Sequence, residues 1–287
     1  MLNDLINQFV DFLNSKNRSS STIIAYRKDL EQLADFCKGK GVTDINLVTI
    51  DMLRDFLNSQ RELGFKEKTI SRKINSIKTF YRFLSSEGKV KTNVARELEH
   101  PKIENVPPHY LTKMEYMALR DVSRRNIRNY TIIELILQTG LRISEIANLK
   151  TQNVKLKSSK PHLVIEPYES NAGRKVYLNN TAIEALENYF KNYDPKTGFF
   201  FTTKTGKQLL VRNIRASISR LLEKAGINNA TINDLRNTYI VHYLKEGMPV
   251  DKVAKQVGHK RTSTTQRYVE LIDPKEIKKN NRRYEDL

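Results

Sequence analysis

The sequence predicts a mainly α-helical protein with a small antiparallel β-sheet, arranged as two domains. Apolar residues recur three or four positions apart through most of the chain, which is the spacing of one helix face. Alternation typical of strands is confined to residues 162–166 and 174–178, on either side of the turn-like segment YESNAG. Residues 100–108, HPKIENVPP, contain three prolines in nine residues, which indicates an extended linker. The predicted organisation is a helical domain at 1–99, a linker at 100–110 and a second domain at 111–287.

The composition is that of a strongly basic protein without membrane or disulfide signals. The 287 residues include 50 Lys and Arg against 32 Asp and Glu, a net charge of +18, and 32 of the 50 lie after residue 105. Such a surplus attracts polyanions, so we expect nucleic acid as the partner, although a merely basic housekeeping protein can have the same totals. The chain has no run of about 18 apolar residues and no secretory signal, so we expect no membrane contact. The single cysteine, Cys37, excludes an internal disulfide and favours a reducing compartment.

Four helices are expected in the first domain, and the fourth is the most informative. The first three cover about 3–15, a span between the serines at 19–21 and Gly39, and about 49–63. The fourth covers about 68–86, and one of its faces is an apolar stripe of Ile70, Ile74, Ile77, Tyr81 and Leu84. The opposite face carries a polar and basic stripe of Lys68, Arg72, Asn75, Thr79 and Arg82.

The polar stripe suits contact with DNA, because basic and hydrogen-bonding side chains in one row can reach phosphates and base edges in a groove. A solvated outer helix face has the same composition, and the stripe by itself does not separate the two. If the stripe contacts DNA, Arg72→Ala should weaken specific DNA binding and leave the fold intact.

The second domain is expected to surround the short sheet with helices. These are expected at about 112–122, 128–139, 181–193, 211–225, 232–246 and 250–257, with a short extended piece at 198–203. Between the second of them and a new helix starting near Ser144, Arg142 lies at a helix junction, which positions a side chain better than a free surface does. Arg212 and Arg215 lie on the helix at 211–225, which we expect to enter a DNA groove next to that of the fourth helix. The residues after Asp273 form a polar, basic tail.

Three motifs, in this order, resemble those of the tyrosine recombinase (phage integrase) family. They are TGLRISEI at 139–146, NDLRNT at 233–238, and Gly258-His259 followed nine residues later by Tyr268. The resemblance covers nearly the whole chain and implies a helical core-binding domain, a linker and a catalytic domain with a three-stranded sheet. It also implies site-specific DNA recombination that needs no metal or other cofactor.

The resemblance assigns a role to each of four residues. Tyr268 would attack a DNA phosphate to give a 3′-phosphotyrosyl link and a free 5′-hydroxyl, and this link stores the bond energy for rejoining without ATP. Arg142 and Arg236 would grip the phosphate, because a guanidinium is always charged and can bind two oxygens at once. His259 would donate to the phosphate or assist proton transfer. The structural alternatives are that Arg142 only pairs with Glu145, that His259 only ends a helix and that Tyr268 is a core aromatic.

The chain departs from the family pattern at two positions. Asn233 stands where the family usually has histidine, and it can donate a hydrogen bond to phosphate but cannot act as an acid or base. Glu169 stands where the family has the lysine that protonates the leaving 5′-oxygen, and a carboxylate there would repel phosphate. Either Lys175 or Arg174 reaches into the site, or the usual acid is absent.

The resemblance implies a homo-tetramer that binds two copies of a specific double-stranded DNA site and exchanges strands through a Holliday junction, with the tail after Asp273 docking on a neighbour. The chain begins almost at the core-binding helices, which favours a Xer-like recombinase or transposon cointegrate resolvase over integrases with an arm-binding domain. The Ser- and Thr-rich segment before Tyr268 would be mobile enough to present or withhold the nucleophile. A type IB topoisomerase-like enzyme and a catalytically weakened DNA-binding protein of the same fold are the alternatives. We expect a prokaryotic cytoplasmic protein associated with the nucleoid.

Overall fold

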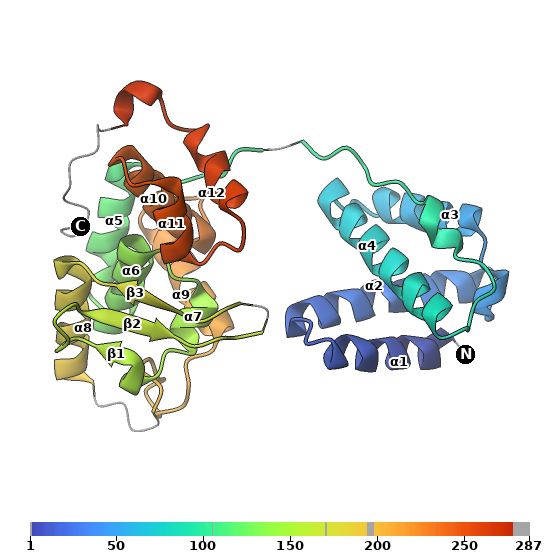
Figure 1. Cartoon of the computed structure of the whole chain (residues 1–287), viewed down its shortest axis with the longest axis horizontal. Helices are drawn as coiled ribbons and strands as arrows, with labels where there is room; N and C mark the ends of the chain where they lie inside the picture. Colours follow the sequence, from blue (N-terminus) through green and yellow to red (C-terminus); the bar gives the residue numbers. More distant parts are fainter. Residues whose placement is uncertain (1, 105, 170, 194–197, 278–287) are drawn as a thin grey trace. The chain divides into compact units, whose positions relative to one another are not determined.

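A computed structural model describes residues 2–104, 106–169, 171–193 and 198–277, and it confirms a mainly α-helical chain with one small antiparallel sheet (Figure 1). The chain divides into two compact units between residues 105 and 106. Within the described residues, no helix has both the length and the apolar character needed to cross a membrane.

The described part of the first unit contains four α-helices, as predicted. They are α1 (Leu2–Ser15), α2 (Ser20–Gly39), α3 (Ile50–Glu62) and α4 (Glu67–Ser86), with 3-10 turns at Ile45–Leu47 and Val94–Glu97. Ser19 and Thr49 begin α2 and α3, because the side-chain oxygen of each accepts a hydrogen bond from the backbone N–H three residues later.

The apolar stripe of α4 is buried in the core of the first unit. Its members are each at most 1% exposed: Ile70, Ile74, Ile77, Tyr81 and Leu84. Phe80 of the same helix meets Phe9 of α1 edge-on, with ring centroids 5.3 Å apart. Burying a side chain of this size stabilises a fold by roughly 1.5–3 kcal/mol. The stripe therefore fixes the rotation of α4 and leaves its opposite face outward.

Arg72, on that opposite face, also makes contacts within the first unit, which bear on the expectation that its removal leaves the fold intact. Its guanidinium forms an ion pair with Asp29 of α2 and donates to the carbonyl oxygen of Ala25 at 3.2 Å. Asp29 is 1% exposed and also pairs with the buried Lys73, whose Nζ lies 3.3 Å from Oδ1. Because a buried carboxylate needs its counter-charges, Arg72 helps to tie α4 to α2.

The second unit packs helices around a three-stranded antiparallel sheet. The helices are α5 (Lys113–Ser123), α6 (Ile127–Thr139), α7 (Ile143–Ala147), α8 (Asn180–Asn192), α9 (Val211–Lys224), α10 (Ile232–Lys245), α11 (Val250–Val257) and α12 (Thr262–Val269). The strands pair in the order β1 (Val154–Lys155), β2 (His162–Ile165) and β3 (Arg174–Tyr177). The sequence predicts β2 and β3 but not β1, and the extended piece at 198–203 forms isolated bridges outside the sheet.

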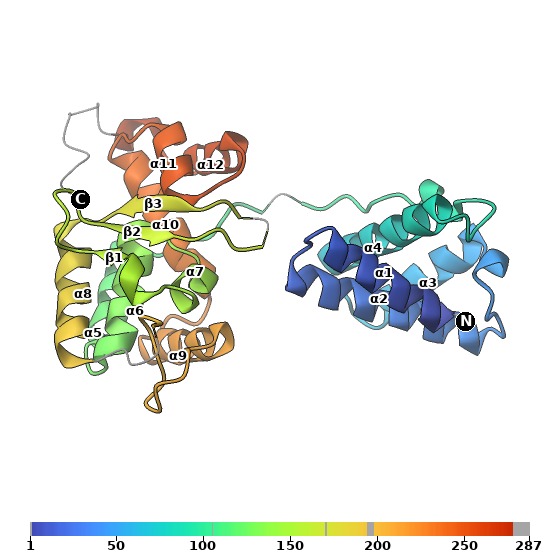
Figure 2. The same ribbon diagram turned by 60° about the horizontal axis from the view of Figure 1, so that its bottom comes forward.

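The C-terminal elements pack against the rest of the second unit. The Ser- and Thr-rich segment predicted to be mobile is the helix α12, which packs against α10 and α11, while α11 also contacts β3 (Figure 2). The 3-10 turn Pro274–Glu276 then packs against its own unit, because Oε2 of Glu276 lies 2.7 Å from Nζ of Lys245 on α10. Residues 278–287 of the predicted docking tail lie outside the described residues.

Candidate active site

Arg142 lies where α6 ends and α7 begins. Gly140 ends α6 with a φ of 64°, and a Cβ there would lie 2.6 Å from the ring of Tyr239, so this turn requires glycine. The backbone N–H of Arg142 donates to Oε2 of Glu145 at 2.8 Å, which helps to cap α7. Its guanidinium donates to the carbonyl oxygen of Gly258 at 2.7 Å. A short, capped helix therefore directs Arg142 towards the end of α11.

Arg236 reaches the same place from α10. Its guanidinium donates to the carbonyl oxygen of Gly140 and, at 2.7 Å, to that of Val257. Nη1 of Arg142 lies 3.4 Å from the same Val257 oxygen, so the two guanidinium groups share one acceptor. Burial, together with the charge of Arg142, lowers the pKa of Arg236 to about 9, which leaves Arg236 charged at neutral pH.

Glu145 is the counter-ion of this basic cluster. Arg174 at the start of β3 binds both of its oxygens, at 2.6 Å for Nη1–Oε1 and 2.9 Å for Nη2–Oε2. Arg142 Nη1 adds a third contact at 3.0 Å. Burial by itself would raise the pKa of Glu145, but the hydrogen bonds and charges of Arg174 and Arg142 outweigh it and hold the pKa below its ordinary range. A carboxylate that stays ionised therefore holds two guanidinium groups together.

Arg174, and not Lys175, reaches the cluster, which corrects the expectation for Lys175. Neighbouring residues of a strand point to opposite faces, and Lys175 is exposed on the face opposite Arg174 and the buried Val176. Glu169 is exposed in the turn before β3 with a φ of 51°. Asn233 is exposed in the first turn of α10, and among the described residues its side chain forms no hydrogen bond.

His259 follows the glycine that ends α11. Gly258 has a φ of 69°, and a Cβ there would lie 2.8 Å from Nη1 of Arg174, so β3 can approach α11 closely only at a glycine. The Nδ1 atom of His259 lies 2.7 Å from Oγ1 of Thr265, which is fully buried on α12. Burial, followed by the charges of Arg236 and its neighbouring arginines, lowers the pKa of His259 to about 4. The imidazole is therefore neutral at pH 7, and the contact with Thr265 orients its ring.

Tyr268 lies on α12 beside His259, with ring centroids 6.3 Å apart and ring planes 23° apart. Its hydroxyl donates to Oδ1 of Asn237 at 2.9 Å. Burial raises the pKa of Tyr268, while the charges of Arg236 and Arg267 oppose this rise. Sequence reasoning does not single out Asn237, and its only signal is that it directly follows Arg236 in the motif NDLRNT.

The four residues predicted to act together do lie together. Arg142 does pair with Glu145, as the structural alternative proposed, but its second nitrogen also binds the carbonyl oxygen next to His259. Tyr268 is only half-buried, and its hydroxyl bonds to a polar side chain, which is unlike a core aromatic. The arrangement offers two fixed cations, a neutral imidazole and a phenol, which is a set suited to attack on a phosphodiester.

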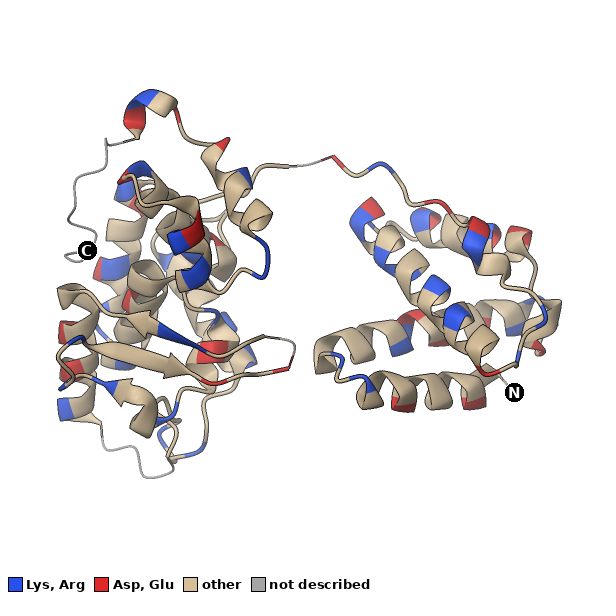
Figure 3. Cartoon of the chain, in the orientation of Figure 1, with Lys and Arg blue, Asp and Glu red and all other residues tan. Residues whose placement is uncertain are grey.

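The predicted DNA-contact residues lie on the outer faces of one helix in each unit. Figure 3 shows basic residues recurring along α4. Those that are exposed are Lys68, Asn75 and Arg82 on α4 and Arg212 and Arg215 on α9. Thr79 is partly exposed and accepts a hydrogen bond from Nη2 of Arg82 at 3.1 Å. These side chains are available to phosphates and bases, with Arg72 restricted by its ion pair.

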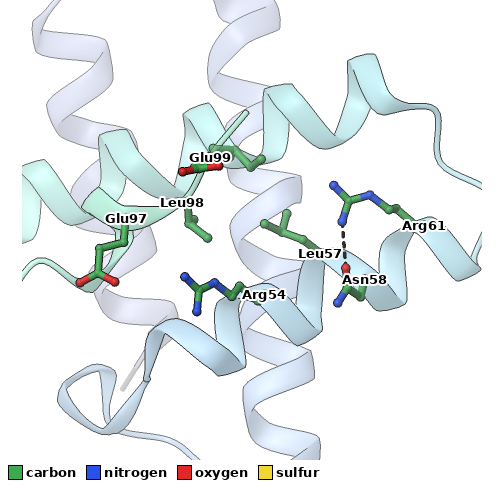
Figure 4. Close-up of a pocket in the computed structure, with 8 residues that line it drawn as sticks. Arg54, Leu57, Asn58, Arg61, Glu97, Leu98 and Glu99 are labelled. Carbon is green, nitrogen blue, oxygen red and sulfur yellow. Dashed lines mark hydrogen bonds between the residues drawn. The ribbon is translucent and has the colours of Figure 1, made fainter. Parts of the chain in front are cut away.

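A cavity of about 390 Å³ in the first unit is lined by none of the predicted site residues. It is lined by both signs of charge, from Arg54 and Arg61 on α3 and from Glu97 and Glu99 (Figure 4). Nη1 of Arg61 donates to Asn58 at 2.9 Å. Because the charges oppose one another, the cavity has no preference for an anion. Among the residues that the structure describes, no group of three or more His, Cys, Asp or Glu side chains is placed to hold a metal ion.

Comparison with known proteins identifies the family. The model of the phage integrase family matches residues 109–274, and that of the N-terminal SAM-like domain of phage integrases matches residues 6–88. The chain belongs to the phage integrase family. This tyrosine recombinase is 32% identical over 283 residues to the tyrosine recombinase XerC of Oceanobacillus iheyensis, covering 93% of this chain and 91% of the relative. It is 29% identical over 282 residues to the tyrosine recombinase XerD of Staphylococcus epidermidis, covering 94% and 95%.

Solved structures share the fold of this tyrosine recombinase. A lambda integrase fragment, solved as a dimer bound to a core site, matches with a TM-score of 0.76 at 16% identity, covering 92% of this chain and 94% of that chain. A lambda integrase tetramer bound to a Holliday junction matches with a TM-score of 0.74 at 17% identity, covering 92% and 76%. Membership of this family confirms the prediction that the chain is a site-specific recombinase.

Proposed function

We propose that the chain cuts and rejoins double-stranded DNA at a specific site, with Tyr268 as the nucleophile. The observation that carries this proposal is the shared Val257 carbonyl, which places the guanidinium groups of Arg142 and Arg236 next to each other beside His259. Three segments that lie far apart in the sequence thus supply one anion site and one phenol. Neither helix packing nor solubility requires that arrangement.

The residues divide the chemistry between them. Arg142 and Arg236 bind non-bridging oxygens of the scissile phosphate and stabilise the extra charge of the transition state. The Tyr268 oxygen bonds to phosphorus and loses its proton to solvent, while the bond to the 5′-oxygen breaks and this oxygen takes a proton from solvent to become a free 5′-hydroxyl. The phosphotyrosyl link then holds the 3′ end until rejoining. His259, neutral at pH 7, donates a hydrogen bond to the phosphate from the ring edge not held by Thr265. Asn233, three residues before Arg236, can donate to the same phosphate.

In this proposal the predicted helical domain at 1–99 binds DNA with the outer face of α4, and the predicted catalytic domain at 111–287 binds it with α9 and carries out the reaction. Similarity to the tyrosine recombinases XerC and XerD supports a Xer-like recombinase, for which we propose resolution of dimers or transposon cointegrates as the reaction. The lambda integrase tetramer on a Holliday junction supports a homo-tetramer working on two sites. No cofactor is required in this scheme, because the arginines provide the positive charge. We place the protein in the cytoplasm, at the nucleoid.

A nicked DNA substrate carrying the recombination site tests the proposal, because loss of the short 5′-hydroxyl fragment traps the covalent complex. A denaturing gel should show a protein–DNA band with the wild-type chain and none with Tyr268→Phe. Absence of the band with the wild-type chain would refute the mechanism, whereas a band that survives Tyr268→Phe would refute only the choice of nucleophile. Exchange of flanking DNA between two labelled sites separates recombination from simple relaxation.

A further inference from the structure

The side-chain amide of Asn237 has one orientation that satisfies its surroundings. One of its ends lies 2.7 Å from the carbonyl oxygen of His109 and 3.2 Å from Oδ1 of Asp234, and both of these atoms can only accept. The NH₂ group must therefore face them. Oδ1 then faces Tyr268, whose hydroxyl lies 2.9 Å away.

This orientation favours the neutral form of the nucleophile. An amide oxygen accepts hydrogen bonds and cannot donate them, so the contact exists only while Tyr268 is a neutral phenol. The charged and titratable groups around the phenol are Arg236 and Asp234 on α10, Arg267 on its own helix, and the imidazole of His259 at the end of α11. The arginines favour the phenolate, whereas burial, Asp234 and the bond to Asn237 favour the phenol.

The acceptor at His109 belongs to the segment that enters the second unit. Two residues later, the backbone N–H of Leu111 donates to Oγ1 of Thr238 at 2.8 Å, so the segment is attached to α10 at two successive residues of the helix. Asp234, which accepts from Asn237, and Thr238, which accepts from Leu111, are each 7% exposed, so packing in the core holds both of these acceptors in place. The path of the chain before α5 thus sets the orientation of the amide that holds the nucleophile.

We propose that Asn237 is a positioning residue that holds the Tyr268 hydroxyl in a protonated resting state and links it to the segment at His109. The inference rests on the proposed role of Tyr268 as the nucleophile. When the Tyr268 oxygen bonds to phosphorus, its proton leaves for solvent or a base and the bond to Asn237 is lost. A change in the path of the segment before α5, as DNA is bound, is then a way to release the tyrosine.

Single-turnover formation of the covalent complex on the nicked substrate, measured between pH 6 and pH 10, tests the inference. Asn237→Ala removes the acceptor that favours the phenol, so the pH at which the rate rises should move down by about half to one unit. Asn237→Asp keeps an acceptor and adds a negative charge beside the phenol, so that pH should move up. Asn192→Ala, which removes an amide from an exposed position of α8, should leave the profile unchanged.

The two Asn237 variants separate positioning from structural damage. Loss of structure would lower the rate of both and move neither profile, so shifts in opposite directions support the inference, and equal or absent shifts overturn it. Thr238→Val removes the attachment of Leu111 and should shift the profile in the same direction as Asn237→Ala, by less; an unchanged profile would overturn the link to the segment. Failure of the wild-type chain to form the complex, or its formation by Tyr268→Phe, would instead refute the proposed function.

Discussion

The guanidinium of Arg174 lies in a bidentate contact with the carboxylate of Glu145, at 2.6 Å and 2.9 Å, and both side chains are nearly buried. Removing one partner of a buried ion pair costs about 3 kcal/mol, and here it takes from Glu145 the counter-charge that binds both of its oxygens. Arg174→Ala should therefore lower the free energy of unfolding by that amount, measured by urea denaturation. It should also reduce covalent complex formation, because Glu145 then binds Arg142 alone.

Arg220→Ala is the control for Arg174→Ala. Arg220 is exposed on α9, and its Nε bonds only to a carbonyl oxygen of its own helix among the described residues. Its removal should change stability by no more than about 0.5 kcal/mol. Equal effects of the two substitutions would contradict a structural role for the Glu145 pair.

Gly258 and Gly226 provide a matched test of the close approach between α11 and β3. Both have a positive φ, 69° and 75°, so alanine at either position costs about 1 kcal/mol of backbone strain. A Cβ at Gly226 meets nothing within 4 Å, whereas one at Gly258 would lie 2.8 Å from Nη1 of Arg174. Gly258→Ala should therefore be the more destabilising by urea denaturation, and it alone should impair cleavage. Similar losses would show that φ, and not Arg174, requires the glycine.

The sequence predicts the elements of this fold better than their contacts. The buried face of α4 follows from periodicity, because packing against one core selects residues three or four positions apart. No local pattern predicts that Arg142 and Arg236 lie together, because the contacts that bring them together are long-range. Arg142 and the Gly258 carbonyl oxygen that it binds, for example, are 116 residues apart. Only the resemblance to a family predicts that meeting before the structure.

The predictions from sequence that failed did so for different physical reasons. The residues of α12 have low helix propensity, so tertiary packing of Thr265 and Tyr268 against α10 and α11 overrides a local preference for a loop. The strand β1 has two residues, which is too short for alternation to be visible. Arg72 fits the polar stripe by spacing, and only the structure shows the buried Asp29 beneath it. Asn237 gains its importance from a partner 31 residues away.

The exposed part of the α4 stripe should bind DNA phosphates. Lys68→Ala and Arg82→Ala should each weaken binding and reduce the slope of log affinity against log salt by about one, measured by fluorescence anisotropy at several salt concentrations. Arg72→Ala should differ, because it removes a counter-charge from Asp29 and lowers thermal stability. An unchanged salt slope for both Lys68→Ala and Arg82→Ala would show that the face is only solvated.

Thr265 should control the imidazole of His259. Thr265→Val keeps the shape of the side chain and removes the hydroxyl at 2.7 Å from Nδ1, so the ring loses its orienting bond. The loss of one hydrogen bond predicts up to about a tenfold fall in cleavage rate. Thr265→Ser restores the hydroxyl and should recover most of the rate. An unchanged cleavage rate in the valine variant would contradict an orienting role for the Thr265 hydroxyl.

The low pKa of His259 predicts a dependence of stability on pH. In the folded chain the pKa is about 4, whereas an unfolded histidine titrates near its ordinary value of about 6.5. Between these values the unfolded chain binds a proton that the folded chain does not, so the contribution of His259 to stability is lost as pH falls below about 6.5. Because the ring is partly exposed, solvent screening reduces this loss to about 1 kcal/mol between pH 7 and pH 5. Urea denaturation of His259→Gln should show a smaller fall over that interval than the wild-type chain, and an equal fall would mean that His259 becomes protonated in the folded state near its ordinary pKa.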